Sequence, residues 1–366
     1  MKNKMKINFF VPHLEISGGI RVALNYAHFL AEKGHDVQVV FQHKNYRKRI
    51  KNILEFKRGS IREFFDNKPY WYRHLKANIA YKPKINNETL ADADILVAMD
   101  YSKVKLFDVL DRKKGVRFEF IMHDERLYHG DKEDINKVYK RDVNKICVSS
   151  WLQGVIKKDF NQESDVLINP IDTELFFQEK SDKKKENDEI IITMMHHNYE
   201  WKGVEDGVKI FNKVKKETGK NLKLVLFGCR FKKIDIQYDE YYYDSKQEDI
   251  RKIYSDSDIF LCTSEWEGLG LPAMEAMCCK TAVVTYDTGG SRDYAFDNDT
   301  AFVAQHSDLR DLENKLKEAV IYSEKRDQIA QNGYKFITQK IDTWAESVEK
   351  MEKIFNNKLA KRSNES

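Results

Sequence analysis

The sequence of 366 residues lacks the features that mark membrane-spanning and nucleic-acid-binding proteins. No apolar run approaches the ~20 residues that cross a bilayer. The net charge is only +4, whereas a domain that binds phosphate backbones usually concentrates basic residues on one face. The composition therefore predicts neither a membrane-spanning helix nor a nucleic-acid partner.

Cysteine pairs with metal-binding or redox spacing are also missing. Five cysteines occur, namely Cys147, Cys229, Cys262, Cys278 and Cys279. They are scattered and odd in number, which favours free thiols in a reducing compartment over a disulfide framework. The first apolar run follows a basic start but is broken by Asn8 and Pro12, so it predicts a strand rather than the core of a signal peptide. We therefore expect a cytoplasmic protein.

The residues that are present suit a globular α/β protein. Hydrophobic residues make up 41% and charged residues 33% of the chain, and its length suggests two domains. Ile7–Val11 and Val37–Phe41 predict strands, and apolar spacing over Ile20–Lys33 predicts a helix between them. This strand–helix–strand unit is typical of a doubly wound parallel sheet.

The same alternation continues along the chain. Further strands are predicted at Ile95–Met99, Phe118–Met122, Ile146–Val148, Ile190–Met194, Leu222–Phe227, Ile259–Cys262 and Thr281–Tyr286. Helices are predicted at Val204–Thr218, Ile250–Tyr254, Pro272–Met277, Leu309–Ser323 and Ile341–Leu359. A hydrophilic run over 181–189 lies near the expected domain boundary. We predict two Rossmann-like doubly wound domains, 1–165 and 166–340, followed by a C-terminal segment, 341–366, whose end from 360 onward is frayed.

An acidic pair lies on a glycine-rich loop, Ser264–Met277, directly after a predicted strand. Gly268 and Gly270 allow a tight turn and a close approach to a ligand, and Pro272 suits the first turn of a helix. In open parallel sheets, ligands bind beyond the carboxyl ends of the strands, where this loop is expected. Carboxylates only accept hydrogen bonds, so Glu267 and Glu275 suit a ligand rich in hydroxyl groups.

This loop resembles the E-G-F-G-L-P-x-x-E signature of family 4 of the retaining glycosyltransferases, the glycosyl transferases group 1. Leu269 stands where that family usually has phenylalanine. Three other segments resemble motifs of the same family, in the same order: Cys147–Leu152, Asn169–Asp172 with Phe176, and Thr281–Asp293. Asp293 stands near the family's last acidic position. The resemblance extends over almost the whole chain.

The resemblance implies a fold of two facing Rossmann-like domains (GT-B), with the C-terminal helix crossing back to the first. It implies transfer of a hexosyl or deoxyhexosyl group from a nucleotide diphosphate sugar to a hydroxyl acceptor, with retained configuration, in cell-surface glycan or polysaccharide synthesis. Glu275 should hold the ribose hydroxyls and Glu267 the donor sugar, while the backbone of Gly268, Leu269, Gly270 and Leu271 lines the sugar and diphosphate. The family requires no metal, and no other cofactor is expected.

Two segments are candidates for the diphosphate. Gly18 and Gly19 lie between the first strand and the first helix, resembling the family's double-glycine loop, and Arg21 could add charge. Met195–Gly203 resembles the family's G-R-x-x-x-x-K-G loop, in which Lys202 would bind the diphosphate as a mobile point charge. His197 occupies the arginine position, so part of the usual positive charge is missing. Arg230 is a candidate replacement.

On the acceptor side, His123 follows a predicted strand at a place where the family commonly has a histidine. It could bind the donor sugar or help a proton leave the acceptor hydroxyl. Asp100, after the strand ending at Met99, is a weaker acceptor-site candidate. The pairs Asp92/Asp94 and Asp256/Asp258 resemble the D-x-D metal site of another glycosyltransferase fold, but they precede their strands and so lie at the wrong edge.

A basic amphipathic segment over 46–65 has two interpretations. It could lie on an anionic membrane and bring the enzyme to a lipid-linked acceptor, or pack on the core with its basic face in water. The expected partners are a nucleotide sugar, a glycan or lipid-linked acceptor and, on the first interpretation, a membrane surface. The alternatives to a transferase are a sugar-nucleotide epimerase or phosphorylase-like enzyme of the same fold, and a non-catalytic sugar-binding or membrane-scaffold protein.

Overall fold

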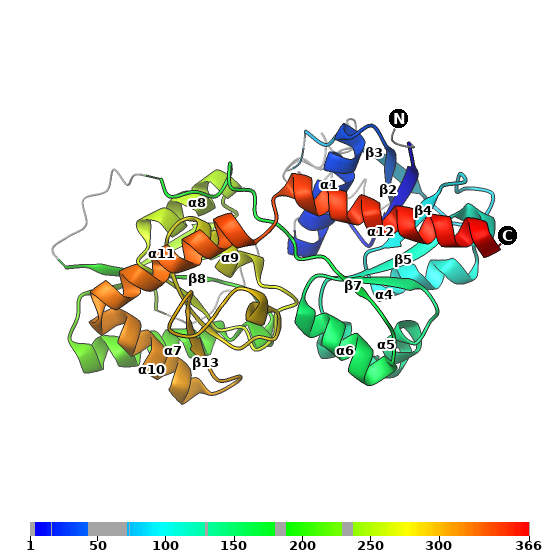
Figure 1. Cartoon of the computed structure of the whole chain (residues 1–366). Coiled ribbons are helices and arrows are strands. Elements are labelled where there is room, and N and C mark those ends of the chain that lie inside the picture. Colours follow the sequence, from blue (N-terminus) through cyan, green and yellow to red (C-terminus); the bar gives the residue numbers. More distant parts are fainter. Residues whose placement is uncertain are drawn as a thin grey trace, which may run out of the picture. The chain divides into compact units, whose positions relative to one another are not determined.

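A computed structural model of the chain describes residues 4–15, 17–42, 72, 74–128, 131–179, 188–228 and 237–365. Its contacts divide the chain into two compact units (Figure 1). Unit 1 comprises Met1–Val148, Leu152–Asn169 and Trp344–Ser366, and unit 2 comprises Ser149–Trp151 and Pro170–Thr343. The basic segment 46–65, Cys229 and Arg230 lie outside the described residues.

Unit 1 is built on a parallel sheet whose described strands have the spatial order β3-β2-β1-β4-β5-β6-β7. The strands are β1 (Lys6–Val11), β2 (Asp36–Gln42), β3 (Asn78–Lys82), β4 (Ile95–Ala98), β5 (Val116–Ile121), β6 (Asn144–Cys147) and β7 (Asp165–Val166). The strand order reverses between β1 and β4. The loops that follow these two strands therefore flank the expected ligand crevice of this sheet.

The described helices of unit 1, apart from the C-terminal one, follow its strands. They are α1 (Gly18–Glu32), α4 (Tyr101–Val104), α5 (Lys132–Tyr139), α6 (Ser150–Phe160) and α12 (Trp344–Glu365), with 3-10 turns η1 (Lys105–Asp108), η2 (Arg112–Lys114) and η3 (Glu125–Leu127). Ser17 caps α1, because its side chain accepts a hydrogen bond from the amide of Ile20. The first turn of α6, Ser150 and Trp151, groups with unit 2.

The C-terminal helix α12 packs on unit 1, although it follows unit 2 in the sequence (Figure 1). The ring of Trp344 stacks on Phe29 with centroids 5.5 Å apart, and Phe355 meets Phe118 at 4.8 Å. Glu352 accepts a hydrogen bond from the side chain of His35 at 2.8 Å. The predicted return of this helix to the first domain is confirmed.

Unit 2 repeats the architecture. Its described strands have the order β10-β9-β8-β11-β12-β13 and are all parallel. They are β8 (Ile190–Met195), β9 (Leu222–Gly228), β10 (Glu240–Tyr243), β11 (Ile259–Cys262), β12 (Ala282–Tyr286) and β13 (Phe302–Ala304). The helices are α7 (Val204–Thr218), α8 (Gln247–Asp256), α9 (Leu271–Cys278), α10 (Leu309–Ile321) and α11 (Ser323–Lys340), with η4 (Glu200–Lys202) and η5 (Gly290–Asp293).

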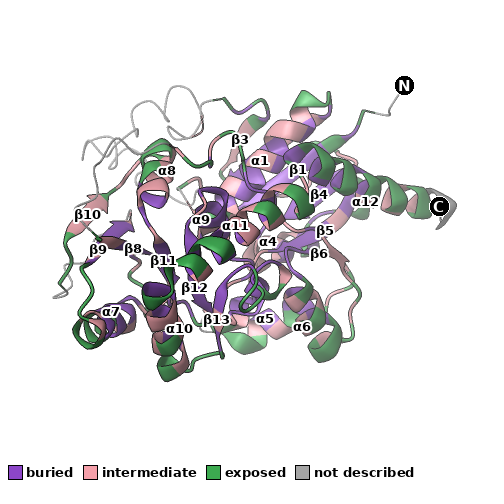
Figure 2. Ribbon diagram, turned by 60° about the vertical axis from the view of Figure 1, so that its left-hand side comes forward, coloured by how far each residue is buried: buried purple, intermediate pink, exposed green. Residues whose placement is uncertain are grey.

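The core of unit 2 lies where the sheet meets its helices. Ile192 on β8, Leu224 on β9 and Val284 on β12 are fully buried with Val214 of α7 and Leu316 of α10. In Figure 2 the strands are largely buried, whereas the helices have exposed outer faces. Burial on both faces explains why these strands are continuous apolar runs rather than alternating patterns.

The structure corrects several predicted boundaries. The glycines Gly18 and Gly19 lie in the first turn of α1 instead of a loop before it, because Ser17 caps the helix and starts it two residues earlier than the apolar pattern predicted. The predicted helix Leu309–Ser323 is interrupted at Tyr322 and continues as α11. The last helix begins at Trp344 rather than Ile341, and residues 360–365 are helical rather than frayed.

The unit boundaries lie between 169 and 170 and between 343 and 344, a few residues after the predicted 165 and 340. Among the helices within the described ranges, none combines the length and apolar character that a bilayer-spanning helix needs. The fold class that the sequence predicted, two doubly wound α/β domains, is confirmed.

Candidate active site

The described strands of unit 2 reverse their order between β8 and β11, which places a ligand crevice at the carboxyl ends of these two strands. A small pocket lies there. Its lining comes from the ends of both strands and the loops that follow, and includes Met195, Lys202, Cys262, Ser264, Glu267 and Pro272. Two candidate residues predicted from separate motifs, Lys202 and Glu267, thus line one pocket.

Lys202 and Glu267 form an ion pair in this pocket. The ammonium Nζ lies 2.5 Å from Oε1 of the carboxylate, and the two side chains are 15% and 16% exposed. Partial burial reduces screening by water, so the pair is stronger than one on the surface. An ammonium has three N–H donors. Lys202 can therefore keep this bond and still donate to an anionic ligand.

The position of Lys202 depends on the glycine that follows it. Gly203 has a φ of +60°, and a Cβ atom there would lie 2.5 Å from the carbonyl oxygen of Thr263. The Thr263 hydroxyl donates to the carbonyl of Lys202 at 2.7 Å, and the Glu265 amide donates to the carbonyl of Trp201 at 2.8 Å. The lysine loop is thereby held against the end of β11, beside the acidic loop.

Backbone pairing fixes the acidic loop. The Glu267 amide donates to the carbonyl of Thr288 at 3.0 Å, and the Gly290 amide donates to the carbonyl of Glu267 at 3.1 Å. Gly270 has a φ of +97°, and a Cβ there would lie 2.5 Å from the hydroxyl of Tyr294, which donates to the Gly270 carbonyl. The glycines thus serve the tight turn that the sequence predicted.

The second glutamate lies on the helix that follows. Glu275 is in α9, one turn beyond Pro272, and is only 4% exposed. Leu269 is 3% exposed, so its side chain belongs to the interior. Gly268 and Leu271 complete this turn at the start of the helix.

An aromatic sandwich next to Glu267 was not predicted from the sequence. The indole of Trp266 stacks on Trp151, with ring centroids 5.4 Å apart and planes inclined by 13°. Trp266 also contacts the His306 ring, with centroids 3.9 Å apart. Gly289 makes room for the Trp151 indole, since a Cβ atom at this position would lie 2.5 Å from that ring. These residues are far apart in sequence, so no local pattern could indicate the contact.

The two histidines of the lysine loop have different roles. His196 is 2% exposed, its Nδ1 lies 2.7 Å from the Tyr241 hydroxyl, and burial lowers its pKa. It is therefore a structural residue. His197 accepts a hydrogen bond from the Tyr199 amide at its Nδ1, and its ring lies 4.2 Å from the Tyr199 ring. An acceptor at Nδ1 places the proton of the neutral imidazole on Nε2, so His197 can offer a donor without charge.

In unit 1, the residues predicted for the diphosphate follow β1. Gly18 and Gly19 are at the N-terminus of α1, and Arg21 donates its amide to the Ser17 carbonyl at 2.9 Å within the same turn. The first-turn amides of a helix attract anions. A Cβ at Gly19 would lie 3.8 Å from the Met122 side chain, so this helix start adjoins the loop that carries His123.

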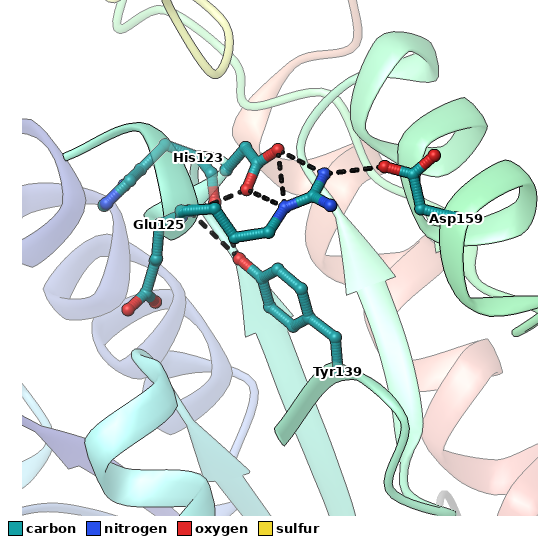
Figure 3. Close-up of polar contacts among 6 residues, drawn as sticks. His123, Glu125, Tyr139 and Asp159 are labelled. Carbon is teal, nitrogen blue, oxygen red and sulfur yellow. Dashed lines mark hydrogen bonds and ion pairs between the residues drawn. The ribbon is translucent and has the colours of Figure 1, made fainter. Parts of the chain in front are cut away.

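His123 lies on the loop after β5 (Figure 3). The centroid of its ring lies 5.1 Å from that of the Tyr128 ring. The candidate Asp100 follows β4, the neighbouring strand, and caps α4 by accepting hydrogen bonds from the amides of Ser102 and Lys103. The carboxyl end of this sheet therefore holds His123, Asp100 and the start of α1.

A buried glutamate lies two residues after His123, on the same loop. Glu125 is 5% exposed and accepts a hydrogen bond from the Tyr101 amide at Oε1, while its buried Oε2 has no hydrogen-bond partner. Burial, with Asp100, Glu119 and Asp124 nearby, raises its pKa to about 9. Burial likewise raises the pKa of Glu119 to about 8, although Lys145 opposes it.

These pKa shifts predict a specific dependence of stability on pH. Glu125 keeps its proton in the folded chain but loses it near its ordinary pKa when unfolded, so the folded state binds more protons between pH 4.5 and about 9. The contribution of Glu125 to the free energy of unfolding is therefore largest below pH 4.5 and is lost as pH rises towards 9, at about 1.4 kcal/mol per pH unit.

Glu125→Gln should remove this slope, because the amide keeps the acceptor for Tyr101 and carries no charge. In denaturant titrations, the free energy of unfolding of the variant minus that of the wild type should rise steadily from pH 5 to pH 8. The exposed Glu88→Gln of the same unit controls for the substitution itself. A difference that stays constant with pH would contradict the assignment.

The remaining acidic candidates have structural partners. Asp94 accepts a hydrogen bond from the Lys6 amide and Asp258 from the Ile191 amide, both at the amino ends of strands. Asp293 accepts a hydrogen bond from the Ser150 amide at 2.8 Å and caps α6. Over the described ranges, no group of three or more His, Cys, Asp or Glu side chains has a metal-binding arrangement. The four described cysteines are free thiols.

Comparison with known sequences identifies the part of the chain that holds this site. Residues 176–336 match the profile of the family described as glycosyl transferases group 1. The capsular polysaccharide biosynthesis glycosyltransferase CapM of Staphylococcus aureus is 21% identical over 370 residues, which cover 93% of this chain and 95% of the relative. The matched family region contains Lys202, Glu267 and Glu275.

Solved structures share the complete fold. Anabaena HepE, in complex with UDP and glucose, superposes with a TM-score of 0.70 at 13% identity, covering 96% of this chain and all of the other. A variant of S. aureus TarM, in complex with fondaparinux, α-GlcNAc-glycerol and UDP, gives a TM-score of 0.69 at 14% identity, with coverage of 96% and 100%. Both units are therefore present in these relatives.

Proposed function

Because the chain belongs to the group 1 glycosyltransferases, we propose that it transfers a hexosyl or deoxyhexosyl group from a nucleotide diphosphate sugar to a hydroxyl acceptor, with retained configuration. The observation that carries the proposal is the Lys202–Glu267 pair in the pocket between β8 and β11. The pair combines a cation for a diphosphate with a carboxylate for sugar hydroxyls.

Each site residue has a chemical role in this reaction. As the bond to the sugar breaks, negative charge grows on the departing diphosphate, and Lys202 stabilises it. His197 adds a hydrogen-bond donor, and the amides of the turn Gly268–Leu271 line the sugar and the diphosphate. Glu275 binds the ribose hydroxyls and Glu267 the donor sugar.

Unit 1 supplies the acceptor side of the proposal. His123 hydrogen-bonds the acceptor hydroxyl and assists departure of its proton, a role that a positioned histidine commonly fills. Gly18, Gly19 and Arg21 supply first-turn amides and a cation for the diphosphate. No metal takes part in this scheme, because Lys202, Arg21 and the amide groups supply the compensating charge.

The acceptor class is proposed to be a glycan or a lipid-linked glycan. The support comes from relatives, since CapM is named for capsular polysaccharide biosynthesis and the TarM variant was solved with sugar-containing ligands. Cell-surface polysaccharide synthesis is the corresponding process. HepE with UDP and glucose makes UDP-glucose the first donor to test.

Binding of nucleotides provides the first test. UDP, GDP and ADP, and then their sugars, should be screened by thermal unfolding, and one nucleoside diphosphate should raise the melting temperature by several degrees. A ligand at 100 times its Kd stabilises the folded state by about 2.7 kcal/mol. Inorganic phosphate serves as the control for unspecific anion binding.

Transfer is then measured with the nucleotide sugar that stabilises the chain most, using octyl glycosides as acceptors. The expected product is an octyl disaccharide whose new linkage keeps the anomeric configuration of the donor. Release of the nucleotide with a changed free sugar, independent of acceptor, would instead identify an epimerase. No stabilisation and no turnover with any of these compounds would contradict the proposal.

A further inference from the structure

A single buried hydroxyl group holds the backbone around His123. Tyr139, the last residue of α5, is 1% exposed. Its hydroxyl accepts a hydrogen bond from the Glu125 amide at 3.1 Å and donates one to the His123 carbonyl at 3.4 Å. The hydroxyl therefore bridges the two residues on either side of Asp124. Burial raises the pKa of Tyr139 well above its ordinary value, so the bridging proton stays in place.

An arginine clamp holds the same loop from a second helix. The Arg126 guanidinium binds both carboxylate oxygens of Asp124, with Nε–Oδ1 at 2.9 Å and Nη2–Oδ2 at 2.7 Å. Its Nη2 also donates to Asp159 of α6 at 2.8 Å. The guanidinium lies over the Phe160 ring, 4.9 Å from the centroid. We name these three residues, Asp124, Arg126 and Asp159, the Arg126 clamp.

The side chain of His123 takes no part in these bonds. In Figure 3, the imidazole extends from the loop on the side away from Asp159, while the His123 carbonyl accepts the hydrogen bond of the Tyr139 hydroxyl. Because these bonds hold the main chain of the loop, they fix the position of the His123 backbone and the direction in which its side chain extends. An imidazole on a loop needs such support to act with a defined geometry.

We propose that Tyr139 and the Arg126 clamp are positioning residues that hold His123 in the orientation in which it acts on the acceptor. The inference rests on the proposed function for the role of His123. Tyr139 touches no reacting group itself and acts through the main chain of the loop. The contacts connect the loop after β5 to α5 and α6, so two helices of unit 1 hold the main chain that carries His123.

The imidazole itself gives a readout that does not depend on the reaction. With histidine labelled selectively by ¹⁵N, His123→Ala identifies the ring signals of His123 in the spectrum of the full chain. In Tyr139→Phe, which removes only the hydroxyl, these signals should shift and broaden.

A second buried tyrosine of the same unit gives the matched control. The Tyr26 hydroxyl lies 2.7 Å from the Ser347 hydroxyl, between α1 and α12. Tyr26→Phe also removes a buried tyrosine hydroxyl, but this hydroxyl is not bonded to the His123 loop. It should lower the melting temperature comparably and leave the His123 signals unchanged. Unchanged His123 signals in folded Tyr139→Phe would overturn the inference.

Turnover tests whether the orientation matters for the reaction. With the nucleotide sugar and octyl glycoside selected above, Tyr139→Phe should lower kcat about 10- to 100-fold while the affinity for the nucleotide stays the same. Placed in the His123→Ala background, the same substitution should lower turnover no further, because its effect passes through His123. An additive loss in the double variant would overturn the inference.

The outcomes separate the inference from the proposed function. If His123→Ala itself leaves turnover unchanged, the acceptor role proposed for His123 fails, and with it the functional part of the inference. If His123→Ala lowers turnover but Tyr139→Phe does not, only the positioning inference fails. Should Tyr139→Phe not fold, Asp159→Ala decides instead, since it releases Arg126 from α6 and must move the same His123 signals.

Discussion

Lys202→Ala is expected to lower turnover about 100- to 1,000-fold, the usual loss when one preorganised group that stabilises developing charge is removed. The affinity for the nucleoside diphosphate should fall as well, because the ammonium meets the diphosphate before and after the sugar leaves. Glu267 would lose its cationic partner at the same time, which leaves a partly buried carboxylate in the pocket.

Isothermal titration with the nucleoside diphosphate found in the screen checks the binding part of this prediction, and initial rates check the rest. Lys209→Ala is the matched control, since Lys209 forms an exposed ion pair with Asp206 in the same unit. Lys202→Arg tests geometry, because a guanidinium keeps the charge but not the compact shape. Equal nucleotide affinity in wild type and Lys202→Ala would contradict the assignment of this lysine.

The second large effect is expected at Glu275, where alanine should abolish nucleotide binding and turnover. The residue is 4% exposed on α9, so alanine also leaves a hole, and Glu275→Gln separates the two causes. The glutamine amide keeps the volume of the side chain, but it offers one neutral oxygen acceptor instead of two charged carboxylate oxygens. Hydrogen bonds to a charged group are worth about 1.5–3 kcal/mol, so Gln should still cost ~100-fold in affinity.

Inorganic pyrophosphate, which lacks the ribose, distinguishes Glu275 from Lys202. As a competitor of nucleotide binding, pyrophosphate should bind Glu275→Gln and wild type equally well, but Lys202→Ala poorly. The exposed Glu265→Gln of the same loop is the control. A parallel loss of nucleotide and pyrophosphate affinity in Glu275→Gln would assign Glu275 to the stability of the loop instead of the ribose.

Local patterns in the sequence identified the elements that carry the site. The glycines of the acidic loop predicted its turn, and the apolar runs predicted the strands that end beside it. Lys202 and Glu267 were predicted from separate motifs, and the structure places them in one ion pair because β8 and β11 are neighbours in the sheet. Parallel strand order thus converts two distant motifs into one pocket.

What the sequence could not indicate depends on contacts between distant segments. Tyr139 ends a short helix after a polar stretch, and nothing near it marks a partner 16 residues earlier. Trp266 meets Trp151 only because Gly289 leaves room for the indole. Nothing in the local sequence marks His196 as buried, yet it is 2% exposed and its Nδ1 lies 2.7 Å from the hydroxyl of Tyr241 on β10. These contacts are set by tertiary packing, which no motif encodes.

The return of α12 to unit 1 has a consequence for biosynthesis. Phe118 of β5 and Phe29 of α1 are covered by Phe355 and Trp344, which the ribosome adds more than 200 residues later. The sheet of unit 1 is therefore translated first, but α12 covers it only at the end of synthesis. Residues Pro170–Thr343 of unit 2 are all translated before α12. During synthesis, unit 2 can reach its native state while unit 1 still exposes an apolar face that chaperones can recognise.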